Sequence, residues 1–170
     1  EITTRLVGSE MCIRDRTSIL EIVIKEYTKS RFSDCVIFEL ALRKEENFWG
    51  WEIDETYKTI VLNSFSDKLF KNAISFLAYV DKKVVGRIDA CLIPSHFDGI
   101  VKAYLDWICV IKSYRHNGIA QKLMQHLRTY LKEIGVNTLV GLIAHNEEAQ
   151  RFYRSLPNAK IQDEGIWIDL

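Results

Sequence analysis

The stretch 101–145 constrains the fold of this chain most, because it predicts a strand, a helix and a second strand joined by short connections. Residues 101–111 (VKAYLDWICVI) and 137–145 (NTLVGLIAH) are rich in the apolar and β-branched residues typical of strands. Between them, apolar residues recur at helical spacing from Gly118 onward, and Gly135 is a typical stop signal. Two strands joined in this way are expected to lie parallel in one sheet.

The rest of the chain predicts further strands and helices on both sides of this unit. A strand is expected at 21–28, helices at 33–47 (with Ser33 as N-cap) and 55–70, two strands within 73–93 around a turn at Asp81–Lys83, a helix at 146–156, and one strand or two very short ones at 160–170. This order predicts a mixed α+β fold, with a central mixed β-sheet of about six to seven strands flanked by four helices.

The composition indicates one globular domain and excludes several classes of protein. The chain has 170 residues, and its 23 Lys and Arg equal its 23 Asp and Glu, so neither nucleic acid nor an anionic membrane is an expected partner. No apolar run approaches the roughly 18 residues of a spanning helix. The cysteines and histidines lack the spacing of disulfide frameworks or metal sites, which favours a reducing, cytoplasmic setting without a metal.

The first residues of the chain do not fit the pattern of the rest. LVGSEMCIRDR has no clear period and joins abruptly to the strand-like ILEIVIKEY. It closely resembles a translated sequencing-adapter read-through, and a disordered native N-terminus is the alternative. Residues 1–16 are therefore not expected to belong to the fold, and residues 17–170 are expected to form a single domain.

The helix expected from Gly118 lacks the acidic residues that usually occupy a first turn. No Asp or Glu lies between Trp107 and Lys132, and the charged residues of that stretch are all basic. A helix N-terminus carries unpaired N–H groups and partial positive charge, and glycine lets a ligand approach the backbone closely. These features predict an anion site, most naturally for phosphate or pyrophosphate. The alternative is a plain loop-to-helix junction with basic residues for solubility.

The spacing of residues around this helix start narrows the choice of anion. The arrangement Arg115-x-x-Gly118-x-Ala120 is neither Gly-x-Gly-x-x-Gly nor a Walker motif, so a dinucleotide or nucleoside triphosphate is poorly supported. LDWICVIKSYRHNGIAQKLM resembles the acetyl-CoA motif of the GNAT (Gcn5-related N-acetyltransferase) superfamily, Arg/Gln-x-x-Gly-x-Gly/Ala after a strand that ends in an aliphatic residue. AHNEEAQRFYRSL is similar to the family's Asn-x-x-Ala-x-x-x-Tyr helix, and the likeness covers the plan from about Ile22 to Leu170.

The resemblance implies acetyl-CoA as the co-substrate and assigns residues to it. The pyrophosphate is expected on the backbone amides of Arg115, His116, Asn117, Gly118, Ile119 and Ala120. The pantetheine arm is expected along the strand at Ile108 and Val110, and against Asn146. From the residues alone, plainer roles stay open: Ile108 and Val110 as core residues, and Asn146 as the N-cap of its helix.

Two side chains match the positions at which the family performs proton transfer. Tyr153 matches the tyrosine that donates a proton to the departing CoA thiolate, and its alternative role is packing. Asp106 matches a common carboxylate position and is proposed as the base, directly or through an ordered water, or as a clamp on the ammonium group. Because it lies four residues before Val110 in a strand, both are expected on one face. Its alternatives are a solvent-facing position or an ion pair with Arg87.

The sequence is less specific about which residues bind the acceptor, the amine that would receive the acetyl group. Aromatic and acidic residues near two loops would suit a cationic amine, namely Trp49, Trp51, Glu52, Asp54, Glu55, Asp89, His96 and Asp98. They can equally be packing or solvated residues. The chain departs from the family pattern at 156–159 (LPNA in place of Gly-Phe), which bears on the acceptor side and on whether it is a monomer or a homodimer.

The predicted activity is transfer of an acetyl group from acetyl-CoA to a primary amine of a small molecule or peptide by direct attack. A non-catalytic acyl-CoA-binding regulatory domain of the same fold is the first alternative, and a nucleotide-binding domain is the second.

Overall fold

The computed structural model of the protein describes residues 20–46, 51–162, 165–166 and 168. The segment 1–16 and Trp49 therefore lie outside the described residues. The elements, in chain order, are β1 (Val23–Glu26), α1 (Phe32–Glu45), α2 (Glu55–Ser64), β2 (Ala73–Val80), β3 (Lys83–Pro94), β4 (Val101–Val110), α3 (Ile119–Glu133), β5 (Leu139–Gly141) and α4 (Glu147–Ser155), with single 3-10 turns at Lys29–Arg31, Lys68–Phe70 and Lys112–Tyr114. This is a mixed α+β fold, as predicted.

The described strands form one sheet in the order β1-β2-β3-β4-β5. The first four pair antiparallel, and β4 pairs parallel with β5 through the crossover helix α3, which confirms the parallel pair predicted from the sequence. β2 and β3 form a hairpin around Asp81 and Lys82, whose φ angles of 47° and 63° are those of the tight turn that suits a twisted hairpin.

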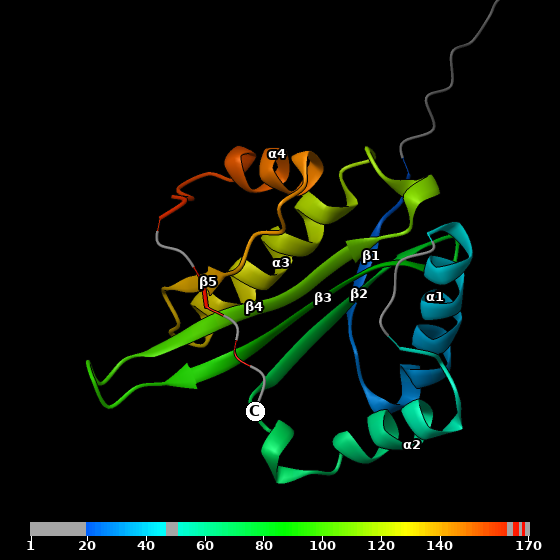
Figure 1. Ribbon diagram of the computed structural model, residues 1–170, viewed down its shortest axis with the longest axis horizontal. Coiled ribbons are helices and arrows are strands. Elements are labelled where there is room, and N and C mark those ends of the chain that lie inside the picture. Colours follow the sequence, from blue (N-terminus) through cyan, green and yellow to red (C-terminus); the bar gives the residue numbers. More distant parts are fainter. Residues whose placement is uncertain (1–19, 47–50, 163–164, 167, 169–170) are drawn as a thin grey trace, which may run out of the picture.

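Helices cover both faces of the sheet, with α1 and α2 on one side and α3 and α4 on the other (Figure 1). On the α3 side, alternate residues of β2, β3 and β4 pack against Leu123, Leu127 and Leu131 of the helix. On the opposite side, Phe38 and Leu42 of α1 pack against the other alternate residues of β2. The central strands are therefore buried on both faces, which explains their nearly continuous apolar sequence.

The sheet has five strands within the described residues, not the six to seven predicted. The missing strand is the one expected at 160–170, whose described residues form no strand. The physical reason is that its described isoleucines are not buried: Ile161, Ile166 and Ile168 are 47%, 82% and 68% exposed. The alternation that predicted a half-buried strand is present in the sequence, but in these described residues it produces no buried face.

Two helix predictions also need correction. Ser33 is not an N-cap but lies inside α1, because the turn Lys29–Arg31 runs directly into that helix. The helix predicted at 55–70 ends at Ser64 and gives way to a separate turn that Asp67 caps by accepting the Leu69 N–H. The prediction for α3 is confirmed, since the helix begins immediately after Gly118 and ends before Gly135.

The N-terminal part of α3 lies close against the sheet at Gly86 of β3. A Cβ atom at this position would approach Ile119 Cγ2 to 3.0 Å and Leu123 Cδ1 to 3.1 Å, so the absence of a side chain allows the close packing. Gly86 is the register partner of Val110, the last residue of β4. The start of α3 is therefore held against the end of β4.

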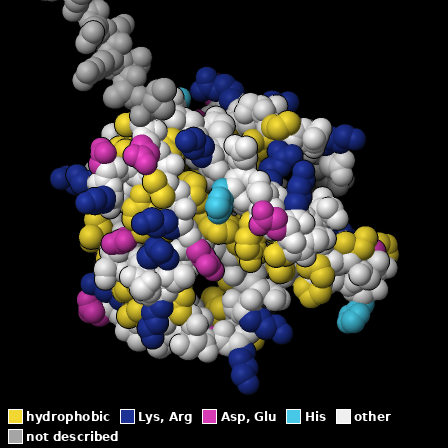
Figure 2. All heavy atoms as spheres, turned by 180° about the vertical axis from the view of Figure 1, so that it is seen from behind, with side chains coloured by type: hydrophobic (Ala, Val, Ile, Leu, Met, Phe, Trp, Pro, Cys, Tyr) yellow, Lys and Arg dark blue, Asp and Glu magenta, His cyan; other side chains and the backbone are white. Residues whose placement is uncertain are grey.

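Basic and acidic side chains are interspersed over the face seen in Figure 2. The β3–β4 hairpin extends away from the body (Figure 1) and carries exposed apolar residues, of which Phe97 is 95% exposed. In the part of the chain that the structure describes, no helix has both the length and the apolar content needed to span a bilayer.

Candidate functional site

β4 and β5 pair over a short distance and then separate. The register partners are Ala103–Leu139, Tyr104–Val140 and Leu105–Gly141. Beyond Leu105, β4 continues to Val110 with β3 as its neighbour on one side, while the chain after Gly141 turns toward α4. The edge of β4 that faces α4 is therefore open from Asp106 to Val110.

The backbone groups of β4 point into this opening at alternate residues. Ile111 donates its N–H to the Val85 carbonyl at 2.9 Å, while Val110 is opposite Gly86 in the register. In an antiparallel ladder, hydrogen-bonded and non-hydrogen-bonded pairs alternate, so the N–H and C=O of Val110 and Ile108 point away from β3. These are the two residues at which the resemblance predicts contact with a pantetheine arm.

A β-bulge interrupts β4 at Asp106. Leu105 pairs with Ala90 and Trp107 pairs with Asp89, so Asp106 is an extra residue without a partner in β3. The prediction that Asp106 and Val110 share a face assumed unbroken alternation, and the bulge removes that basis. The side chains that interact electrostatically with Asp106 belong instead to β3 and β4, among them Asp89.

A cavity of about 660 Å³ opens between the separated strands, the start of α3, and α4. Its wall contains the predicted catalytic and co-substrate residues apart from Asn117, namely Asp106, Ile108, Val110, Arg115, His116, Gly118, Ile119, Ala120, Asn146 and Tyr153. The side-chain amide of Asn117 instead donates to the carbonyls of Tyr114 and Arg115 at 3.1 and 3.0 Å. The fold thus gathers residues that are up to 47 positions apart in sequence around one opening.

Backbone amides at the start of α3 form one wall of this cavity. Gly118 caps the helix in the left-handed conformation (φ 76°) without a side-chain bond, and His116 is also left-handed (φ 63°). Within the described residues, no N–H from His116 to Gln121 donates to a protein acceptor; the first that does is that of Lys122, to the Gly118 carbonyl at 3.0 Å. Such a row of N–H groups at a helix N-terminus attracts an anion.

The Arg115 side chain is occupied by other parts of the protein. Its guanidinium lies 2.9 Å from Glu46, just after α1, and 3.2 Å from Glu148 in the first turn of α4, while Nε donates to the Val110 carbonyl at 3.0 Å. Two acids distant in sequence thus supply the negative charge that the loop lacks locally. Glu45 also fixes the loop by accepting the N–H and Oγ–H of Ser113, and these bonds lower the pKa of that carboxyl group.

Asn146 and Tyr153 lie on α4 across the cavity. Asn146 Oδ1 accepts the Ala149 N–H at 2.8 Å, so its predicted role as N-cap is confirmed. Tyr153 packs edge-on against Phe152 with 5.2 Å between ring centroids. Burial, and to a lesser degree Tyr104, raise the pKa of the Tyr153 phenol, which keeps it protonated at neutral pH.

Asp106 presents a carboxylate at the cavity wall without a hydrogen bond or ion pair to any other described residue. Burial raises its pKa, the charge of Asp89 raises it further, and Arg87 opposes both effects. The alternative of an Asp106–Arg87 ion pair is not observed, because Arg87 pairs with Asp89 and Glu39. A carboxylate of this kind is available to accept a proton.

Most residues predicted for the acceptor side have other roles or lie elsewhere. None of the described ones (Trp51, Glu52, Asp54, Glu55, Asp89, His96 and Asp98) lines the cavity. Asp54 caps α2, Glu55 pairs with Lys58, and Asp98 pairs with Lys102 in the β3–β4 hairpin. Trp107, which the sequence did not single out, does line the cavity, and its position beside Asp106 was the available signal. Among the described residues, no three His, Cys, Asp or Glu side chains are grouped as a metal site requires.

Solved structures of acetyltransferases share this fold. An aminoglycoside acetyltransferase, meta-AAC0020 from an uncultured soil metagenomic sample, in complex with sisomicin, matches with a TM-score of 0.74 and 16% identity over 88% of this chain and 96% of that chain. The ribosomal-protein-alanine N-acetyltransferase from Brucella melitensis biovar Abortus 2308 matches with a TM-score of 0.68 and 17% identity over 88% and 99%. AAC(6')-Iy, solved with a bisubstrate analogue containing CoA, matches with a TM-score of 0.70 and 17% identity over 88% of this chain and 98% of that chain.

No curated protein matches the sequence closely enough to count as a relative. At identities of 16–17%, the structural matches concern the fold. A sequence model of the acetyltransferase (GNAT) family, in contrast, matches residues 18–156. This range includes the start of α3, the bulged strand and α4, and the chain therefore belongs to the acetyltransferase (GNAT) family.

Proposed function

We propose that this protein is an acetyl-CoA-dependent N-acetyltransferase acting on a primary amine. The observation that carries the proposal is that unpaired amides at the start of α3 (His116 and Gly118 to Gln121) and the open edge of β4 line the same cavity. A pyrophosphate needs N–H donors at a positive helix end, and an arm containing amide groups needs backbone partners like those of a sheet. The membership of the family supports the same co-substrate.

The described residues fit acetyl-CoA in a specific order along the cavity. The amides of His116 to Ala120 would hold the pyrophosphate, and the backbone groups of Ile108 and Val110 would pair with the pantetheine arm. Asn146 lies opposite on α4, where its side-chain N–H₂ can donate while its Oδ1 caps the helix. The Arg115 guanidinium would hold the loop in place through Glu46 and Glu148.

Acetyl-CoA supplies an acetyl group activated as a thioester. Asp106 would accept a proton from the incoming ammonium or amine, and the Val110 N–H, which points to the open side of β4, would polarise the acetyl carbonyl oxygen. Tyr153 would give its phenolic proton to the departing sulfur. The new C–N bond forms as the C–S bond breaks, and one proton passes from the amine side to the thiol side of the cavity.

The acceptor is proposed to be a cationic amine. The solved relatives in fold include an enzyme bound to the aminoglycoside sisomicin and one named for a ribosomal-protein alanine, which both carry amino groups. In this chain, Asp106 and Trp107 are neighbouring residues of the cavity wall. A carboxylate beside an aromatic face attracts an ammonium group.

A panel of amines tests the function directly. With acetyl-CoA present, we expect at least one aminoglycoside, polyamine or peptide amine to cause release of free CoA, measured with a thiol reagent, and mass spectrometry to find the acetylated amine. Tight CoA binding with no release by any amine would favour the non-catalytic acyl-CoA-binding domain. Binding of ATP or NAD at 116–120 without protection by CoA would favour a nucleotide-binding domain.

Replacing Tyr153 with phenylalanine is expected to lower kcat by about 10²-fold or more, since a lost general acid typically costs that much. The affinity for acetyl-CoA, measured by calorimetry, should change little because the ring remains. Tyr130→Phe is the matched control, since Tyr130 packs on Phe76 (5.4 Å between centroids) and does not line the cavity. If both variants keep the parent kcat, Tyr153 is not the acid.

A further inference from the structure

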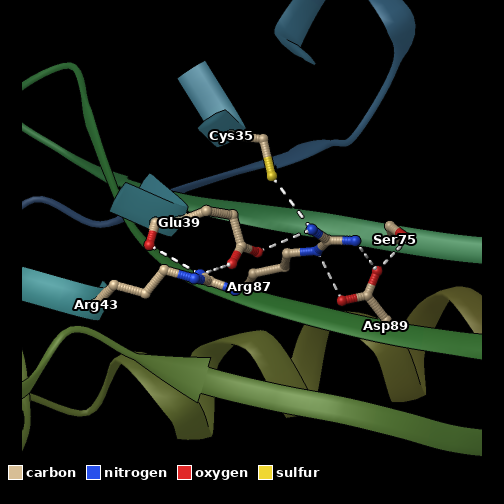
Figure 3. A network of polar contacts seen from close by, with 6 residues as sticks. All are labelled: Cys35, Glu39, Arg43, Ser75, Arg87 and Asp89. Atoms are coloured by element: carbon tan, nitrogen blue, oxygen red, sulfur yellow. Dashed lines mark hydrogen bonds and ion pairs between the residues drawn. The ribbon is translucent and has the colours of Figure 1, made fainter. Parts of the chain in front are cut away.

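A buried network of charged and polar side chains lies between α1 and β3, on the side of the sheet away from α3 (Figure 3). At its centre, the Arg87 guanidinium lies 2.8 Å from Asp89 Oδ1 and 3.2 Å from both Glu39 Oε1 and Cys35 Sγ. Glu39 is only 1% exposed and also contacts Arg43 at 2.7 Å. Burying carboxylates is costly unless cations partner them, so this arrangement needs Arg87 in its place.

Aromatic rings complete the surroundings of Arg87. Its Cζ lies 4.9 Å from the ring centroid of Tyr27 and 5.8 Å from that of Trp107. Burial alone would lower the pKa of Arg87, but the charges of Asp89 and Glu39 outweigh it, and the guanidinium stays charged. The network therefore holds the Arg87 guanidinium near the ring of Trp107, the residue that follows Asp106 in β4.

The network reaches the cavity through the bulge of β4. Asp89 is the register partner of Trp107, and Asp106 is the unpaired residue immediately before it. Trp107 and Asp106 both line the cavity, whereas Arg87, Asp89 and Glu39 lie behind its wall. Arg87 consequently contacts no part of the cavity itself but lies beside the two residues proposed to receive the amine.

We propose that Arg87 is a positioning residue for acetyl transfer: by neutralising Asp89 and contacting the Trp107 ring, it sets the charge state and orientation of the acceptor wall at Asp106. This inference rests on the proposed function of Asp106 as the base. Without Arg87, Asp89 would be an uncompensated negative charge near Asp106, whereas Glu39 would keep Arg43 as its partner. The Asp106 carboxyl would then hold its proton to higher pH, and over that added pH range it could not accept one from the amine.

Other titratable groups near Asp106 do not supply a charge that could offset that of Asp89. The Cys91 thiol on β3 and the Tyr104 phenol on β4 interact with it, and burial raises the pKa of both, so they stay uncharged near neutral pH. Tyr153 on α4 is also protonated at that pH. Asp89 and Arg87 are therefore the charged groups that act on Asp106, with opposite signs.

NMR titration of the Asp106 carboxyl, assigned with Asp106→Asn, tests the inference without requiring turnover. In Arg87→Gln we expect the Asp106 pKa to rise by about half a unit or more, because a nearby cation has been removed. In Asp89→Asn we expect it to fall, because a nearby anion has been removed. Arg43→Gln is the matched control, since Arg43 belongs to the same network but has Glu39, not Asp89, as its ion-pair partner, and its effect should be smaller.

Kinetics supply the second readout once an amine acceptor is found. The acid limb of the kcat/KM profile should move to higher pH in Arg87→Gln by the same amount as the carboxyl titration, while acetyl-CoA affinity stays within about twofold and Arg87→Lys restores most of the profile. An unshifted Asp106 titration in folded Arg87→Gln overturns the inference. If that variant does not fold, an Asp106 pKa that fails to fall in Asp89→Asn overturns it. Absence of turnover in the parent protein would contradict the proposed function. The NMR titration of Asp106 would then still decide whether Arg87 sets the charge state of that carboxyl.

Discussion

Gly118→Glu is expected to lower the affinity for CoA about 100-fold or more. Gly118 caps α3 at φ 76° and lies in the row of amides proposed to hold the pyrophosphate. A glutamate side chain there would bring a like charge to the anion and block its approach to the backbone. Hydrogen bonds to a charged group contribute about 1.5–3 kcal/mol each, so losing one or two accounts for an effect of this size. Calorimetric titration with CoA measures it.

Gly135→Glu is the matched control for this variant. Gly135 follows the other end of the same helix at φ 81°, and at both glycines an added Cβ would meet no atom within 4 Å. Both substitutions place a non-glycine residue in the left-handed region, which costs about 1–2 kcal/mol, so both should lower the melting temperature similarly. The Gly135 variant should nevertheless bind CoA as the parent does. Equal affinities in the two variants would rule out the anion site at 116–120.

Asp106→Asn is expected to lower kcat by about 10²- to 10⁴-fold, the range typical for loss of a general base. The change keeps the shape of the side chain, so CoA affinity and stability should be nearly unchanged. Burial and Asp89 raise the pKa of Asp106, so the base form is lost as pH falls through a value above that of an ordinary aspartate. The acid limb of the parent kcat/KM profile should therefore lie at that higher pH and should be absent from the residual activity of the variant.

Asp81→Asn is the control for removing one carboxylate. Asp81 lies in the β2–β3 turn with φ 47°, a conformation that asparagine adopts readily, and it does not line the cavity. The kcat/KM profile of Asp81→Asn against pH should match that of the parent protein. If Asp106→Asn keeps the full kcat and the acid limb, a water or another group must act as the base.

Local patterns in the sequence were sufficient for the elements that surround the cavity. The apolar spacing after Gly118 and the glycine at 135 predicted α3 nearly to the residue, and Asn146 followed by two acids predicted the start of α4. The short connections of 101–145 were enough to predict a parallel pair. The strand predicted at 160–170 is not confirmed by its described residues, because alternation predicts a face to be buried but cannot show whether anything covers it.

The site was predictable where a contact is local and not where it joins distant segments. Gly118, Asn146 and Tyr153 were predicted as candidate site residues from short motifs, and all three line the cavity. The ion pairs of Arg115 with Glu46 and Glu148 join residues 69 and 33 positions apart, and no local pattern indicates them. The same holds for Arg87 with Glu39, 48 positions apart. The bulge at Asp106 was missed because one additional residue changes neither the composition nor the apparent period of a ten-residue strand enough to be noticed.

The packing of the sheet against its helices does not depend on Asp106. Leu105 on one side of the bulge and Ile108 and Val110 on the other pack toward α3, while Trp107 and Cys109 pack toward α1. A strand shortened by this single residue would alternate without interruption and would bury the same side chains against the same helices. Neither core requires the extra residue, whereas the proposed role of Asp106 as base does, and a gap at this position in a related chain would mark a protein that keeps the architecture without the proposed base.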